Sequence, residues 1–153
     1  MYTAIRIRST VNTKPDIKET LKLLRLNRNN HCVVLNENPH TKGMIQKVKD
    51  YVAWGDISLE TLGRLLHKRG ELEGGVKLSD EYVKAHSSYD SIDDLAQALF
   101  TGEIKLKDLP GLKPLFRLHP PRKGHRGIKK TVSEGGELGY HADGINDLLN
   151  KMR

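Results

Sequence analysis

The chain has 153 residues, of which 37% are hydrophobic and 5% aromatic, and its formal net charge at pH 7 is +7. This length allows one domain, or a small domain with an elaboration, and the low aromatic content predicts a thin core. The single cysteine, Cys32, excludes an internal disulfide, and no apolar run resembles a signal peptide or a membrane span, so we expect a soluble, cytoplasmic protein.

The positive charge is concentrated at the two ends of the chain. Residues 1–57 carry a net charge of +5, residues 58–115 a net charge of −2, and residues 116–153 a net charge of +4. A positive surface attracts polyanions because binding releases condensed counterions. The distribution points to two basic segments as candidate contacts with a nucleic acid, and these segments could converge on one surface.

The first 57 residues predict a β-α-β-α-β unit. The expected elements are strands near 4–8, 31–35 and 51–57 and helices that begin at Pro15 and Pro39. Both helices would cover one face of a small sheet. Arg6 and Arg8 alternate with Ile5 and Ile7, so we expect both arginines on the other face, open to RNA or to the middle region.

The second of these helices carries the most informative pattern in the chain. After the Asn38-Pro39 turn, apolar residues recur at helical spacing, which predicts one buried stripe. The opposite face holds cations and a glycine: Lys42, Gly43, Lys47 and Lys49. An exposed helical glycine costs about 1 kcal/mol relative to alanine, and close approach of a sugar-phosphate backbone is one reason to keep it. A solvated lysine face would give the same pattern, so both interpretations stay open.

Residues 58–115 predict a helical insert between core strands. Ser58, Ser79 and Ser91 each precede a helical pattern with acidic residues in its first turn, as N-cap residues do. Gly70 and Gly102 follow the first and last of these patterns, at positions where glycine commonly ends a helix.

Residues 116–153 predict a returning strand, a basic loop and a C-terminal helix. Residues 117–130 contain six Lys and Arg and no acid, and their prolines and glycines exclude a helix or a central strand. The candidate RNA contacts here are Arg117, Arg122, Lys123, Arg126, Lys129 and Lys130. Without Asn, Gln or aromatic residues, this loop would contact phosphates and 2′-hydroxyl groups rather than base edges. A flexible, solvated tail is the alternative interpretation.

The sequence contains no motif for catalysis, a metal or a cofactor. None of the seven histidines form a pair at the i, i+4 spacing of helical metal ligands. The glycines within 135–139 do not complete a dinucleotide-binding fingerprint, and Glu134 and Glu137 would repel phosphates there. We therefore expect no enzymatic activity and no cofactor.

Three separated motifs resemble one protein family. Asn38-Pro39, followed by Gly43-Met44-Ile45 and Lys47-Val48, is similar to the signature helix of the large-subunit ribosomal protein family numbered thirty in the bacterial scheme. Residues 116–124 resemble the basic C-terminal segment of that family, and residues 134–149 resemble the tail of its longer archaeal and eukaryotic form. The long basic N-terminal extension of eukaryotic members is missing, which argues for an archaeal source.

The resemblance implies a ferredoxin-like core whose three-stranded antiparallel sheet has the order three-one-two. It also implies a structural, non-catalytic role in the large ribosomal subunit, with 23S rRNA as the main partner, 5S rRNA as a second candidate, and neighbouring ribosomal proteins. The predicted class is α+β: an RNA-binding core at 1–57, a helical insert at 58–115, and a segment at 116–153 that packs on the core. Two alternatives stay open, a small ferredoxin-like enzyme acting on a phosphate-bearing substrate and a free RNA chaperone.

Overall fold

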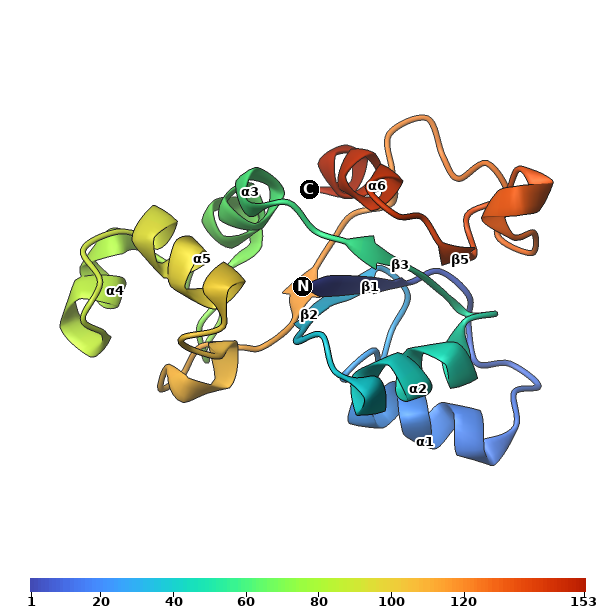
Figure 1. The fold of residues 1–153 in the computed structure, drawn as a ribbon, viewed down its shortest axis with the longest axis horizontal. Coiled ribbons are helices and arrows are strands. Elements are labelled where there is room, and N and C mark those ends of the chain that lie inside the picture. Colours follow the sequence, from blue (N-terminus) through green and yellow to red (C-terminus); the bar gives the residue numbers. More distant parts are fainter.

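The computed structural model describes residues 1–153 as a five-stranded sheet with helices on both faces (Figure 1). The strands are β1 (Tyr2–Arg6), β2 (His31–Leu35), β3 (Val52–Asp56), β4 (Phe116–Arg117) and β5 (Gly139–Tyr140). The helices are α1 (Pro15–Leu23), α2 (Pro39–Val48), α3 (Leu59–Arg69), α4 (Asp80–His86), α5 (Ile92–Thr101) and α6 (Gly144–Met152), with short 3-10 helices η1 (Leu106–Asp108) and η2 (Val132–Glu134). The predicted α+β class is confirmed.

The sheet is built around its central strand, β1. Its strand order is β4-β2-β1-β3-β5, and β1 is antiparallel to both β2 and β3, so the order three-one-two within the first 57 residues is confirmed. The expectation of a three-stranded, wholly antiparallel sheet was wrong. β4 extends the sheet beside β2, and β5 pairs in parallel with β3. β5 has two residues, which is too short for an alternating pattern to reveal it in the sequence.

Helices α1 and α2 cover one face of the sheet (Figure 1). Each has a proline in its first turn, and at the start of α2 the Asn38 side chain accepts a hydrogen bond of 2.7 Å from the Thr41 amide. The predicted stripe of α2 is buried at Ile45 and Val48. These residues belong to a cluster of ten buried side chains: Tyr2, Ala4, Leu21, Leu24, Leu26, Val33, Ile45, Val48, Val52 and Trp54.

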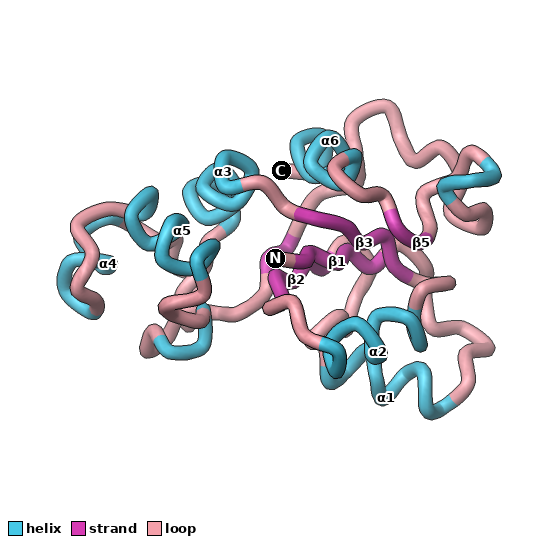
Figure 2. The backbone as a smooth tube through the Cα atoms, in the orientation of Figure 1, coloured by secondary structure: helices cyan, strands magenta, loops and turns pink.

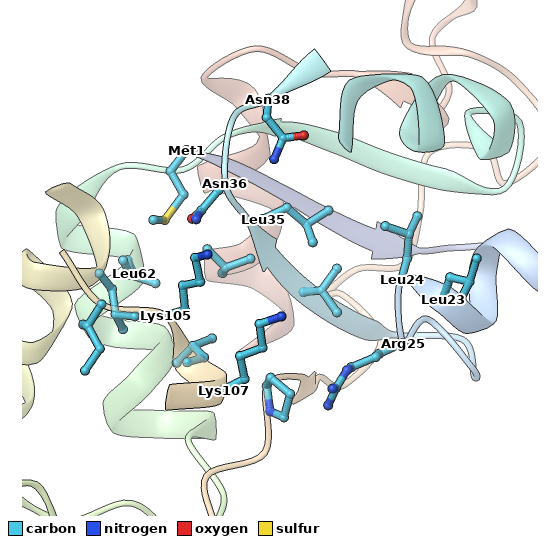
Figure 3. A pocket seen from close by; sticks show the side chains of 16 residues that line it. Met1, Leu23, Leu24, Arg25, Leu35, Asn36, Asn38, Leu62, Lys105 and Lys107 are labelled. Carbon is cyan, nitrogen blue, oxygen red and sulfur yellow. The ribbon is translucent and has the colours of Figure 1, made fainter. Parts of the chain in front are cut away.

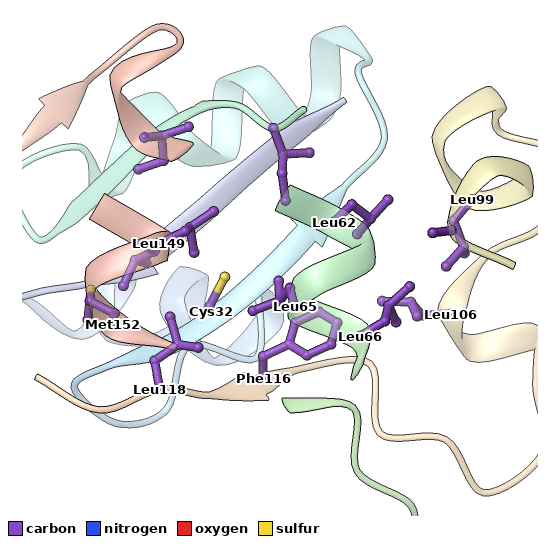
Figure 4. Packing of buried hydrophobic residues seen from close by; sticks show 14 of the residues in the cluster. Cys32, Leu62, Leu65, Leu66, Leu99, Leu106, Phe116, Leu118, Leu149 and Met152 are labelled. Atoms are coloured by element: carbon purple, nitrogen blue, oxygen red, sulfur yellow. The ribbon is translucent and has the colours of Figure 1, made fainter. Parts of the chain in front are cut away.

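The opposite face of the sheet is covered by α3 and α6. A second cluster of 24 buried hydrophobic residues fills the space between the sheet and these helices, part of which is shown in Figure 4. It draws on all three segments distinguished in the sequence, with Ile5 from the first, Leu65 from the insert and Leu149 from the C-terminal segment. The insert therefore shares its hydrophobic core with the strands it interrupts.

The helices of the insert begin where the sequence predicts them. Ser58, Ser79 and Ser91 accept hydrogen bonds from the amides of the residues three positions later, at 3.2, 3.3 and 3.1 Å. Gly102 ends α5 in the left-handed conformation, with φ of 86°. The amphipathic α5 packs along α3, and α4 packs on α5 at the far end of the molecule (Figure 1).

The C-terminal segment returns to the sheet. β4 pairs with β2, and the stripe of α6 is buried at Ile145, Leu148, Leu149 and Met152. Between β4 and β5 the chain forms a long loop interrupted by η2 (Figure 2). None of the helices is long and apolar enough to cross a membrane.

Candidate RNA-binding surfaces

The exposed face of α2 carries three lysines and one glycine, and the glycine has no side chain to cover the helix backbone. Lys42, Gly43, Lys47 and Lys49 are all exposed. A Cβ atom added at Gly43 would meet no other atom within 4 Å, so the helix backbone is open to solvent at this point. Lys47 lies 3.6 Å from Asp16 of α1, an exposed ion pair that leaves Lys47 free to turn toward another anion.

The two arginines of the first strand do not form the open basic face that the sequence suggested. Arg6 is only 4% exposed, and its guanidinium donates hydrogen bonds to the carbonyls of Leu26 at 2.9 Å and Arg8 at 3.0 Å. It lies on the side of the sheet covered by α1 and α2, because Ile5 and Ile7 take the side covered by α3 and α6. Burial lowers the pKa of Arg6, whose role is to bind main-chain carbonyls of the core.

Arg8 is half-buried at the end of α2. Its guanidinium donates a hydrogen bond of 3.3 Å to the Asp50 carbonyl and lies 5.3 Å from the centre of the Tyr51 ring. These contacts bring Arg8 beside the residues that follow Lys49, so the structure groups Arg8 with the basic end of α2. Arg6 and Arg8 therefore have different environments, and only Arg8 belongs to the basic surface of α2.

The basic loop is tied to the body of the protein along its length. The amides of His119 and Arg122 donate to the carbonyls of Met152 and Lys151, at 3.0 and 3.1 Å, and so satisfy groups at the C-terminal end of α6. Further along, the Gly127 carbonyl accepts from the Glu137 amide at 3.0 Å. The loop is therefore joined to the rest of the protein by main-chain hydrogen bonds at several points, which favours an anchored loop over a flexible tail.

Most cations of the basic loop have no acidic partner. Arg122, Lys123, Arg126, Lys129 and Lys130 are exposed, and none forms an ion pair within 4 Å. Arg117 differs, because it lies in β4 and its guanidinium is 4.0 Å from Glu71 of the insert, which also binds Lys113 at 2.6 Å. Five uncompensated cations thus remain on one anchored loop.

A buried carboxylate, which sequence reasoning missed, holds the middle of this loop. Glu137 is 7% exposed and accepts a hydrogen bond of 3.2 Å from the Arg126 amide. His141 donates to the Glu137 carbonyl at 2.8 Å, and its ring lies 4.0 Å from the carboxylate. Burial lowers the pKa of the neighbouring His125, while the charge of Glu137 acts in the opposite direction. The sequence offered one signal, an acidic residue within a segment otherwise rich in cations and glycine.

Glycines in the same region permit close contact between two stretches of main chain. A Cβ atom at Gly136 would overlap the main-chain carbonyl of Lys130, and the Gly136 amide donates to the Thr131 carbonyl at 2.7 Å. Gly135 has φ of 81°, a conformation that other residues rarely adopt. These glycines therefore close the end of the basic loop, and no phosphate-binding role is needed to explain them.

The two basic surfaces are separated by the sheet. Helix α2 covers one face of the sheet together with α1. The basic loop runs beside α6, which covers the opposite face (Figure 1). They do not converge into one patch, so a single RNA segment would have to wrap around the edge of the sheet to contact both. No group of three or more His, Cys, Asp or Glu side chains is arranged to hold a metal ion.

The chain is similar in sequence to known ribosomal proteins. The sequence profile of a ribosomal protein family, described as Ribosomal protein L30p/L7e, matches residues 2–52. Over the full length of both chains, the protein is 59% identical to a protein of Methanothrix thermoacetophila, 56% identical to one of Methanocella arvoryzae and 54% identical to one of Archaeoglobus fulgidus. Each of these relatives is named large ribosomal subunit protein uL30.

The chain therefore belongs to the uL30 family of large ribosomal subunit proteins. The expected long archaeal form is confirmed, because these archaeal relatives match it from end to end. The family is one of structural, non-enzymatic proteins, so the alternative of a phosphate-processing enzyme is set aside.

Proposed function

We propose that this protein is a structural constituent of the large ribosomal subunit and binds rRNA through phosphate and shape contacts. The observation that carries the proposal is the anchored basic loop with its five exposed, unpaired cations. A loop that is already fixed loses little conformational entropy when it binds, so its cations can follow a phosphate backbone at low cost. The names of the archaeal relatives support the ribosomal setting.

The chemistry of the loop favours recognition of RNA shape over sequence. Most of its exposed side chains are lysine and arginine, and residues 117–130 include no Asn, Gln, Phe, Trp or Tyr side chain that could read or stack on a base. Folded RNA presents phosphates and 2′-hydroxyl groups along its accessible minor groove. We infer that 23S rRNA is the main partner, that 5S rRNA is a second candidate, and that the exposed face of α2 binds a separate RNA segment from the loop.

A charge reversal in the loop tests this function. The variant replaces five residues with glutamate: Arg122, Lys123, Arg126, Lys129 and Lys130. We expect it to lose binding to a 23S rRNA transcript in a filter-binding assay, while its circular dichroism spectrum stays near wild type, because these side chains take no part in the core.

The matched control reverses the same amount of charge at five exposed lysines of the insert: Lys68, Lys77, Lys84, Lys105 and Lys107. We expect the control to retain most of its affinity. If the loop variant bound the transcript as tightly as the control at physiological salt, the loop would not be an rRNA contact.

A further inference from the structure

An apolar groove separates the insert from the edge of the sheet (Figure 3). Its volume is about 380 Å³, and ten of its sixteen lining residues are hydrophobic. On the core side it is lined by the half-buried Leu35 with the buried Leu24 behind it, and on the insert side by the half-buried Ile104 with the buried Leu62, Leu99 and Leu106 behind it. Leu23, at the mouth of the groove, is 68% exposed, although leucine is usually covered.

The floor of this groove is the second half of strand β2, which pairs with β1 on one side and with no strand on the other. β4 pairs with β2 only at two positions, His31 with Arg117 and Cys32 with Phe116. Continuing this register would place Pro114 opposite Val34, and proline has no amide hydrogen to donate. β4 therefore ends before it covers the second half of β2, and Val33, Val34, Leu35 and Asn36 line the groove instead.

The main-chain groups of Val34 point into the groove. Successive residues of an antiparallel strand direct their main-chain groups to alternate sides. On the β4 side of β2, the Asn30 carbonyl accepts from the Leu118 amide at 3.0 Å, and Cys32 pairs with Phe116. Val34 is two positions beyond Cys32, so its N–H and C=O face the same side, where the sheet has no further strand.

The rim of the groove is positively charged. Arg25, Lys105 and Lys107 line it and are exposed, and Figure 3 shows both lysines reaching across toward β2. No Asp or Glu is among the lining residues. A ligand that fits this site would combine apolar side chains for the walls, negative charge for the rim, and main-chain donors and acceptors for Val34.

We infer that the groove binds an extended, acidic peptide segment of another protein, which adds to β2 as an edge strand. A peptide with alternating apolar and acidic residues has all three properties, because alternate side chains of a strand point to opposite faces. RNA could satisfy the cations, but it has no peptide ladder to pair with Val34 and would leave the apolar walls in contact with charged groups. The edge of a sheet left open in this way is a ready template for strand addition.

This inference rests on the proposed function in one respect: a ribosomal subunit would bring other protein chains close to the groove. The groove lies on the insert side of the sheet edge, away from the basic loop, and the following titration contains no rRNA. A failure of peptide binding would leave rRNA binding untouched, and a failure of rRNA binding would leave the groove untouched.

The test is an NMR titration of the full chain with the capped peptide acetyl-Glu-Val-Glu-Val-Glu-Val-Glu-amide. We expect amide shifts at Val34 and Asn36, and hydrogen exchange of the Val34 amide should slow about tenfold when the peptide concentration reaches ten times its Kd. The same peptide N-methylated at its valines loses main-chain donors and should not bind. A version with lysine in place of glutamate should also fail, because the rim repels it.

Two protein variants complete the test. Lys105→Glu together with Lys107→Glu should weaken peptide binding by about 3- to 10-fold, as expected for two exposed ion pairs. Lys77→Glu together with Lys84→Glu changes the charge equally at exposed sites outside the groove and should leave the affinity unchanged. The inference is overturned if the N-methylated peptide binds equally well, if no shift occurs at Val34, or if octauridylate rather than the acidic peptide occupies the groove.

Discussion

The main-chain amide of Arg126 donates a hydrogen bond to the carboxylate of Glu137, a buried residue eleven positions further along the chain. This contact fixes the middle of a loop whose exposed side chains are mostly cations. The carboxylate of Glu137 is buried and shapes the loop, while the cations of the loop are exposed. A mutation of Glu137 can therefore change the geometry of the loop without removing a cation.

Replacing Glu137 should loosen the basic loop. We expect Glu137→Ala to lower the free energy of unfolding by about 1–3 kcal/mol, because the Arg126 amide loses its acceptor in a half-buried site. Affinity for rRNA should fall as well, although no cation has been removed. Glu137→Gln keeps an amide oxygen at the same place and should behave nearly as the wild type. Urea denaturation and filter binding would measure the two effects, and equal results for both variants would contradict the anchoring role.

Gly43→Ala should separate helix stability from RNA binding. The added methyl group meets no protein atom, so the change should stabilise α2 by up to about 1 kcal/mol. If an RNA backbone packs against this spot, rRNA affinity should nevertheless drop. Gly144→Ala is the matched control, since this helical glycine is also exposed and also has open space around its Cβ position. An unchanged affinity for Gly43→Ala would remove this part of α2 from the RNA contact.

The salt dependence of binding should report the number of phosphates contacted. If about 6–8 phosphates are neutralised, a plot of log K against log salt concentration should have a slope of about −4 to −7. Lys129→Ala and Lys47→Ala should each make the slope shallower by about one and weaken different RNAs alike. Lys84→Ala, on α4, should leave the slope unchanged. A flat salt response in the wild type would exclude binding dominated by phosphate contacts.

The three segments of the chain should unfold together. Leu62, Leu65 and Leu66 of the insert pack in the same cluster as Ile5 and Phe116, and losing one such leucine costs about 2–5 kcal/mol. Removing residues 58–115 should therefore abolish cooperative unfolding. A shorter excision of residues 73–111, between the bridged Leu72 and Leu112, keeps α3 and should retain a cooperative transition at a lower temperature. Thermal melts followed by circular dichroism would decide, and cooperative melting of the larger deletion would establish an independent core domain.

Cys32 should be a reporter of unfolding. Burial raises the pKa of its thiol to about 12, so the folded protein should not react with Ellman's reagent at pH 8 until it unfolds. The same shift affects stability. The folded state holds the thiol proton more tightly than the unfolded state. The contribution of Cys32 to the free energy of unfolding is therefore complete below pH 9 and decreases as the pH rises toward 12. Urea melts of the wild type and of Cys32→Ala across this range would show a steeper loss of stability for the wild type.

Features that depend on neighbours in the sequence were predictable from the sequence. The N-cap serines of the insert, the prolines that begin α1 and α2, and the stripes of α2 and α6 all follow from local backbone chemistry and from the helical period. The concentration of positive charge at the two ends of the chain also needed no structure.

The tertiary structure decided everything that depends on which distant segments meet. Alternation along β1 shows that Arg6 and Ile5 occupy opposite faces, but it does not say which face receives α1 and α2, and the sequence argument chose the wrong one. The parallel strand β5, the anchoring of the basic loop by Glu137, and the open edge at Val34 result from contacts between residues far apart in the chain. The periodicity of a sequence shows which side chains share a face of a strand or helix. Which element covers that face is decided only by the packing of the whole chain.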